Sequence, residues 1–140
     1  MALKASQLTI GHTHRERVCE NLSRTQIVQY AGAAGDYHPL HTDEVYATQV
    51  GGYTGVFAPG MLTMGLTGKM LTNWAGDTRL TKFGVRFTDK VWPGDTLESE
   101  ATVSAIRHEN GEYLVDLTVS TVNQDGEIVV SGRATVRVDP

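Results

Sequence analysis

The second half of the chain alternates apolar and polar residues, which is the pattern of strands with one buried and one solvated face. The alternation is clearest in residues 114–122 and 134–138. Asn110-Gly111 and Asp125-Gly126 interrupt the pattern, and such dipeptides are typical of hairpin turns. The pattern therefore predicts an antiparallel sheet, with strands over residues 80–91, 96–108, 112–123 and 127–138.

The first half contains helix patterns and one further strand. Residues 60–74 carry apolar side chains around most of a helix circumference, which predicts a buried central helix. An earlier helix is predicted to begin after Ser23, because Ser23 and Gln26 form a capping-box pattern, and to end at Gly35. A strand over residues 8–21 precedes this helix, and we expect it at an edge of the sheet.

The length and composition fit a single domain over residues 1–140. With 140 residues, of which 40% are hydrophobic, the chain can form one substantial core. The predicted elements favour the α+β class, with an antiparallel sheet wrapped around the long central helix. No repeat or linker-like segment divides the sequence.

Charge and cysteine content exclude several kinds of partner and location. The formal net charge is -4 and the basic residues are scattered, so the sequence lacks the basic patch of a nucleic-acid-binding protein. No apolar run is long enough to cross a bilayer, which predicts no membrane partner. Cys19, the single cysteine, cannot form an internal disulfide, and the first residues lack the apolar run of a secretory signal. We therefore expect a cytoplasmic protein.

The loop after the first predicted helix carries the strongest chemical signal. Asp36 and His41 place a carboxylate and an imidazole close together in the sequence. Pro39 fixes its own φ and holds His38 extended, so a bent loop and not a helix is predicted between them. A short helix should follow, with Thr42 as its N-cap. Two proton carriers facing one pocket indicate general acid–base chemistry, and the same residues also suit an ordinary Asx turn.

The region around this loop resembles a known family. Residues 30–47 are similar to the signature of MaoC-like, R-specific enoyl-CoA hydratases and dehydratases: an aromatic residue, small residues, Gly-Asp, a proline, an aliphatic residue and histidine. Residues 58–62, 85–87 and 91–95 are similar to three further segments of that family. The resemblance covers most of the chain. It implies the hot-dog fold, in which two sheets join edge to edge in a homodimer.

The resemblance also implies a reaction and roles for three residues. The reaction is reversible addition of water to a trans-2-enoyl thioester, which gives a 3R-hydroxyacyl thioester. Asp36 and His41 would share that water, one as base and the other as acid, in either assignment. The backbone N–H of Gly60, at the start of the central helix, would donate to the thioester oxygen. Coenzyme A or acyl carrier protein would carry the substrate. No cofactor or metal is expected, since no spacing of His, Cys and Asp resembles a metal motif.

Three positions depart from the family pattern, and they bear on two alternative functions. His38 stands where the family usually has asparagine, Pro59 where it usually has histidine, and Gly68 where well-studied hydratases often have serine. We expect His38 to support the loop. One alternative is a hot-dog acyl thioesterase, although enzymes of that kind generally lack the Gly-Asp to Pro-Leu-His loop. The other is a non-catalytic partner subunit of a heteromeric dehydratase, against which the intact Asp36 and His41 argue.

Overall fold

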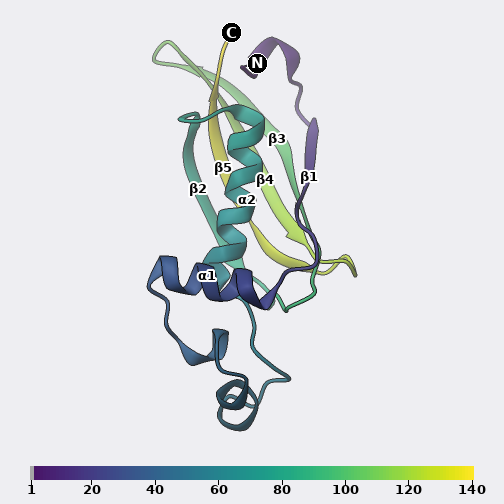
Figure 1. The fold of residues 1–140 in the computed structure, drawn as a ribbon. Helices are drawn as coiled ribbons and strands as arrows, with labels where there is room; N and C mark the ends of the chain where they lie inside the picture. The colour runs from purple at the N-terminus through teal and green to yellow at the C-terminus, as the bar shows by residue number, and fades with distance from the viewer. Residues whose placement is uncertain (1) are drawn as a thin grey trace.

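One antiparallel sheet curves around one long helix in the computed structural model, which describes residues 2–140 (Figure 1). The strand order is β1-β3-β4-β5-β2, so β1 and β2 form the two edges of the sheet. The long helix is α2, Gly60–Ala75, and the shorter helix is α1, Arg24–Ala34. The strands are β1 (Thr13–Cys19), β2 (Leu80–Phe87), β3 (Leu97–Glu109), β4 (Glu112–Val122) and β5 (Ile128–Val138). Short helical turns lie at Ala5–Gln7, Pro39–His41 and Tyr46–Val50, the last of which is a π-helix.

The predicted hairpin between β3 and β4 is confirmed. Asn110 and Gly111 both have positive φ, 51° and 76°, as a two-residue turn of type I′ requires. Glu109 pairs with Glu112 across this turn, and the antiparallel register runs unbroken from the turn to the pair Ala105 and Asp116. A register shift between Val103 and Ala105 then sets the facing of the rest of β3, so the turn and this shift together decide which residues face the helix.

Two strands are shorter than the pattern predicts. β2 ends at Phe87 and not at residue 91. The next two N–H groups, of Thr88 and Asp89, both donate to the Val129 carbonyl near the start of β5 (2.9 and 3.4 Å), and by residue 91 the chain bonds to the segment before α2, where the Ala58 N–H donates to the Val91 carbonyl (2.8 Å). β1 begins at Thr13 and not at residue 8, because a turn precedes it and the His12 N–H donates to the carbonyl three residues earlier (3.0 Å). β1 does form an edge of the sheet, as expected.

The core lies between α2 and the inner face of the sheet. Gly68 lets β2 approach the helix, since a Cβ atom there would lie 3.1 Å from the ring of Phe83. A sheet wrapped around one central helix is the hot-dog fold of the α+β class, which confirms the expected architecture. Within residues 2–140 no helix is long and apolar enough to span a membrane. The buried side chains at the centre of the core include Met70, Leu71, Val115, Leu117 and Val136.

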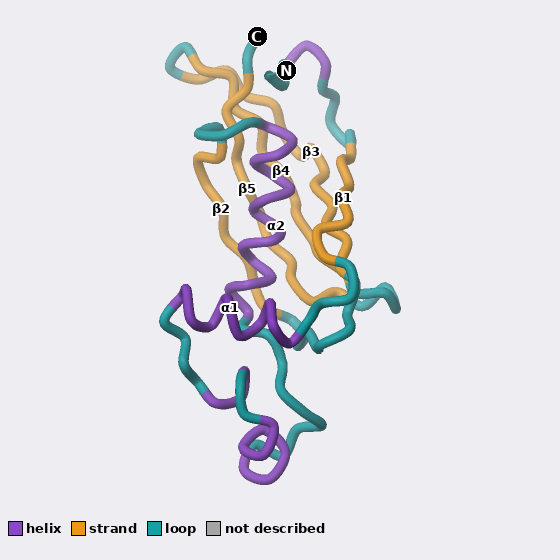
Figure 2. Tube along the Cα trace, viewed as in Figure 1, coloured by secondary structure: helices purple, strands orange, loops and turns teal. Residues whose placement is uncertain are grey.

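α1 and the connection to α2 lie at one end of the sheet, beside the start of α2 (Figure 2). The predicted ends of α1 are confirmed: the Ser23 hydroxyl accepts a hydrogen bond from the Gln26 N–H (3.0 Å), and Gly35 closes the helix in the left-handed conformation. The two termini lie at the other end of the molecule, where Lys4 and Asp139 pair. The loop with the candidate residues is therefore next to the N-terminus of the central helix.

Candidate active site

The end of α1 places Asp36. Gly35 has φ of 71°, a conformation that favours glycine, and it turns the chain out of the helix. The Asp36 N–H donates to the Ala31 carbonyl (3.0 Å), so the first residue of the loop is anchored to the last turn of α1. The Asp36 side chain is 44% exposed, and its carboxylate is accessible to a bound molecule.

His38 is extended, with φ of -62° and ψ of 128°, as predicted, and the bent loop after it contains one 3₁₀ turn, Pro39–His41, that the sequence did not predict and that leads to the imidazole. Proline is well suited to the first position of a helical turn, because it has no N–H to leave unpaired. His38 caps the turn through its side chain, whose Nδ1 accepts from the Leu40 N–H (3.2 Å). This contact orders the loop between the two candidate residues.

Asp43 caps the next helix, whereas the sequence predicted Thr42 as its N-cap. The Asp43 carboxylate accepts from the Tyr46 N–H (3.1 Å), which is the bond of an N-cap. Thr42 instead closes the preceding turn, since its N–H donates to the Pro39 carbonyl (3.2 Å). The side-chain oxygens of both residues suit a cap, and the position of the 3₁₀ turn decides between them.

His41 has a defined orientation, with one ring nitrogen facing Asp36. Its Nδ1 lies 2.6 Å from the carbonyl oxygen of Phe57, and because a carbonyl only accepts, Nδ1 carries the hydrogen. In the neutral ring Nε2 is then an acceptor, and it lies 3.6 Å from Asp36 Oδ2. That separation is too long for a direct hydrogen bond, but a water oxygen about 2.8 Å from each atom can bridge the pair. The His41 side chain is 11% exposed, so the pair is partly shielded from solvent.

Phe57 ties this loop to the segment before α2. Its N–H donates to the Leu40 carbonyl (3.2 Å), and its carbonyl accepts from His41, so two hydrogen bonds join the segments. Its ring packs edge-on against His41 at a centroid distance of 5.3 Å and contacts Trp92 at 5.6 Å. The ammonium of Lys90 lies 5.7 Å from the centre of the Phe57 ring. Phe57 therefore links the Asp36–His41 pair to the start of α2.

Gly60 begins α2 and lines a cavity of about 220 Å³. A Cβ atom at Gly60 would lie 3.1 Å from the ring of Phe87, so glycine allows this ring to close on the helix start. The N–H groups of the first helical turn lack partners within the helix and point toward its positive end, where they can receive a negatively charged oxygen. The cavity is lined by Phe57, Ala58, Gly60, Thr63, Phe87, Asp89, Lys90, Val91, Val129 and Val130.

The candidate residues divide into two groups that Phe57 connects. Asp36 and His41 are in contact, and His38 lies beside them, with its ring centre 6.2 Å from that of His41. Gly60 belongs to the neighbouring cavity, which neither Asp36 nor His41 lines. Phe57 lines this cavity and also accepts the hydrogen bond from His41, so this one residue connects the cavity with the pair.

An ion pair between α1 and the following segment holds the site loop from outside. Arg24, the first residue of α1, forms a short ion pair with Glu44, and the Glu44 carboxylate also accepts from the Val56 N–H (3.4 Å). The hydrogen bond from Arg24 lowers the pKa of Glu44. These contacts join three segments that the sequence separates.

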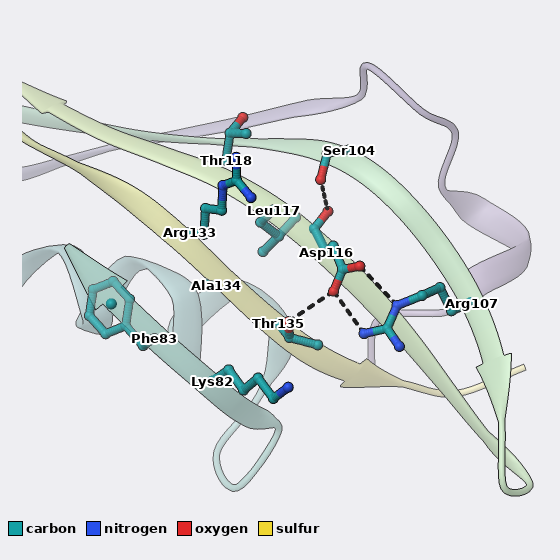
Figure 3. A pocket seen from close by; sticks show the side chains of 11 residues that line it. Lys82, Phe83, Ser104, Arg107, Asp116, Leu117, Thr118, Arg133, Ala134 and Thr135 are labelled. Carbon is teal, nitrogen blue, oxygen red and sulfur yellow. Dashed lines mark hydrogen bonds and ion pairs between the residues drawn. The ribbon is translucent and has the colours of Figure 1, made fainter.

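Another hollow, of about 840 Å³, lies on the outer face of the sheet and contains none of the candidate residues (Figure 3). At its centre Arg107 donates two hydrogen bonds to Asp116 (2.8 and 2.9 Å), and the Thr135 hydroxyl donates a third (2.9 Å). Asp116 and Thr135 alternate along their strands with core residues, so their side chains face away from α2. The hydrogen bond with Arg107 lowers the pKa of Asp116 and raises that of Arg107. This paired cluster joins three strands.

Comparison with known proteins decides the family. The model of the family described as MaoC like domain matches residues 5–124, which is most of the chain. The chain belongs to the MaoC-like domain family. The resemblance seen in the sequence is thereby confirmed.

Relatives of this MaoC-like chain include two curated dehydratases. One is 3-hydroxyacyl-thioester dehydratase Y from Mycobacterium tuberculosis, 36% identical over 69 residues. The other is 3-hydroxyacyl-(acyl-carrier-protein) dehydratase FERN, mitochondrial, from Solanum lycopersicum, 27% identical over 109 residues. The matches cover 47% and 78% of this chain but 24% and 66% of those relatives, so the chain spans less than two thirds of the length of each.

A solved structure supports the same family fold. R-Hydratase PhaJ1 from Pseudomonas aeruginosa, in the unliganded form, superposes on the MaoC-like chain with a TM-score of 0.82 and 25% sequence identity. The superposition covers 96% of this chain and 84% of that structure. Nearly every described element therefore has a counterpart in it.

Several residues of the site did not stand out in the sequence of this MaoC-like chain. Phe57 was recognisable only as an aromatic residue near the central helix, because its decisive group is a backbone carbonyl. Thr63 and Lys90 line the cavity but belong to no motif that the sequence analysis used. Thr63 stands three positions after Gly60, which is the helical spacing for one face and the one signal that could have identified it. Within residues 2–140 no group of three or more His, Cys, Asp and Glu side chains is arranged to hold a metal ion.

Proposed function

We propose that the chain catalyses the reversible hydration of trans-2-enoyl thioesters to 3R-hydroxyacyl thioesters, and the reverse dehydration. The observation that carries this proposal is the orientation of His41. Its Nδ1 is occupied by the Phe57 carbonyl, and its Nε2 faces Asp36 Oδ2 at 3.6 Å. Two proton carriers at that separation suit one shared water molecule.

In this reaction Asp36 and His41 transfer the protons, and the start of α2 stabilises the thioester oxygen. The water oxygen forms a bond to C3 while one member of the Asp36 and His41 pair removes a water proton and the other delivers a proton to C2. The double bond between C2 and C3 thereby becomes single, and water is added without any other reactant. During attack, negative charge develops on the thioester oxygen, and we assign the Gly60 N–H as a donor to it, a contact of a kind typically worth about 3 kcal/mol.

The relatives' names support this reaction class. A 3-hydroxyacyl-thioester dehydratase and an R-hydratase catalyse, by those names, the two directions of the proposed reaction. The chain matches only part of the first, so the extension of its activity to this chain is our inference. We propose coenzyme A or acyl carrier protein as the carrier of the substrate, no cofactor, and His38 as a supporting residue. A cytoplasmic location stays a prediction.

The deciding experiment is hydration of crotonyl-CoA and of a longer trans-2-enoyl-CoA by the purified protein. We expect a 3R product, and we expect Asp36→Asn and His41→Ala each to lower kcat/KM by at least about 100-fold, the lower end of the contribution of a general acid or base. Asp77→Asn is the matched control, because Asp77 is an exposed acid in the turn after α2 and should leave the rate unchanged.

Product analysis separates this function from its alternatives. Release of free coenzyme A with no hydroxyacyl product would identify a thioesterase and contradict the proposal. Absence of turnover by the folded protein on coenzyme A and acyl carrier protein substrates would contradict it too, and would favour a partner subunit.

A further inference from the structure

Thr63 carries a hydroxyl group that the protein itself does not use. The residue is 2% exposed, and none of the hydrogen bonds described within residues 2–140 involves its side-chain oxygen. Over the same residues, no fully enclosed side-chain nitrogen or oxygen lacks a partner. The Thr63 hydroxyl is therefore not fully enclosed, and Thr63 lines the cavity beside Gly60.

Thr67, one turn later on the same helix, differs from Thr63 because its hydroxyl has hydrogen-bond partners within the protein. The Thr67 hydroxyl donates to the Thr63 carbonyl (2.9 Å), which is the ordinary way for threonine to satisfy its hydroxyl in a helix. It also lies 2.6 Å from the hydroxyl of Thr121, which in turn lies 2.6 Å from that of Ser99. Burying an unpaired hydroxyl costs about 1 to 3 kcal/mol. The Thr63 hydroxyl has no protein partner and avoids this cost only through water or a ligand in the cavity, so it is available to a bound molecule.

Gly60 and Thr63 line the same cavity and lie three positions apart on α2. Residues three apart on a helix share a face, and helical side chains lean toward the N-terminus, so the Thr63 side chain leans over Gly60. Gly60 has no side chain to separate the two donors. The rest of the inner wall is apolar, formed by residues such as Phe87 and Val129, while Asp89 and Lys90 are exposed at the surface.

We propose that the Thr63 hydroxyl is a second donor to the substrate thioester oxygen, alongside the Gly60 N–H. This inference rests on the proposed hydratase function and names a further substrate-binding residue for it. Two donors that converge on one oxygen hold the thioester in a single orientation and stabilise the charge that develops there. The hydroxyl can rotate its hydrogen toward the oxygen as charge grows, so its effect should appear mainly in kcat.

Crotonyl-CoA is the probe for this test, because the only polar atom of its acyl group is the thioester oxygen. Thr63→Val keeps the shape of the side chain and removes the hydroxyl, and Thr63→Ser keeps the hydroxyl. We expect the valine variant to lose roughly 10- to 100-fold in kcat/KM, mainly in kcat, because removing one oxyanion donor has effects of this order or larger. The serine variant should stay within about threefold of wild type. Thr72→Val is the control, since the Thr72 hydroxyl donates to the Lys69 carbonyl on the same helix.

The outcomes separate the inference from the proposed function. Active wild type with an equally active Thr63→Val variant overturns the inference alone. Equal losses in the valine and serine variants, with a lowered melting temperature, also overturn it, because they indicate a packing role. Wild type that hydrates neither crotonyl-CoA nor a crotonyl acyl carrier protein overturns the proposed function and this inference together. A loss in kcat confined to the valine variant, at an unchanged melting temperature, supports the inference.

Discussion

One hydrogen bond determines which nitrogen of His41 can take part in chemistry. The Phe57 carbonyl fixes the hydrogen on Nδ1, so the neutral ring presents an acceptor at Nε2 toward Asp36. Because this acceptor on Phe57 is a backbone group, no side-chain substitution removes it directly. The nearest adjustable contact is the cap at His38, which orders the turn that carries His41.

Substitution of His38 tests how much this turn contributes to positioning the imidazole. His38→Ala removes the acceptor of the Leu40 N–H, and a lost neutral hydrogen bond of this kind is worth about 1 kcal/mol. We expect kcat/KM for crotonyl-CoA to fall about 3- to 10-fold. His38→Asn offers a side-chain acceptor at the same place and should recover most of the rate.

An equal fall of kcat/KM in His38→Ala and His38→Asn would contradict a capping role, since only the alanine variant lacks the acceptor. Such a result would point to the imidazole itself as a participant. An unchanged rate in both variants would show that the 3₁₀ turn holds without its cap.

The chemistry of the site could be predicted only in part from the residues. Asp36, His41 and Gly60 stood in recognisable motifs, but the distance between the first two depends on how the loop folds. Thr63 and Thr67 look alike in the sequence, and only the fold shows that Thr67 meets a hydroxyl from β4 while Thr63 does not. Whether a buried polar group is satisfied depends on residues far away in the chain, so the local pattern carries no signal for it.

At the scale of elements, the ends of α1 and the hairpin between β3 and β4 were predicted correctly, whereas the cap at Thr42 and the ends of β1 and β2 were not. Ser23, Gly35 and the Asn110-Gly111 hairpin depend on local hydrogen bonds and φ angles, which the residues themselves determine. The end of β2 depends instead on where its partner β5 begins, because a strand continues only as far as it is paired. Residue 91 keeps an apolar pattern yet bonds to the segment before α2.

The cluster that joins β3, β4 and β5 predicts a pH dependence of stability. The pKa of Asp116 is lower in the folded protein because Arg107 donates hydrogen bonds to its carboxylate. A lowered pKa stabilises the fold above the unfolded value, about 3.9, and this contribution is lost as the pH falls through the folded value. The side chain is 32% exposed, so we expect at most about 1 kcal/mol at pH 7.

Urea unfolding of wild type and Asp116→Asn at pH 7 and near pH 3 measures this contribution. The variant should be less stable at pH 7, and the difference in unfolding free energy should shrink on acidification. Asp125→Asn, in the exposed turn before β5, is the control and should follow wild type at both values. A difference between wild type and Asp116→Asn that is unchanged or larger in acid would show that the ion pair is not its source.

At the scale of the whole molecule, both edges of the sheet expose charged residues, Arg15 and Arg17 on β1 and Lys82 and Arg86 on β2. The β2 edge differs in that it ends in Phe87, a large apolar side chain that is 49% exposed. We therefore propose that two chains form a homodimer through β2. Because Phe87 also lies against Gly60, a partner on this edge would cover the cavity and complete its wall.

Replacement of Phe87 by lysine tests this arrangement, since a charge on an edge strand opposes pairing with a second sheet. Light scattering after size exclusion should give the mass of two chains for wild type and a shift toward one chain for Phe87→Lys. Ile10→Lys is the matched control, because Ile10 is 72% exposed in the turn before β1 and should leave the dimer intact. Hydratase activity of Phe87→Lys should rise with protein concentration if the partner completes the cavity. A wild type of single-chain mass that is fully active would instead show that one chain encloses its own substrate.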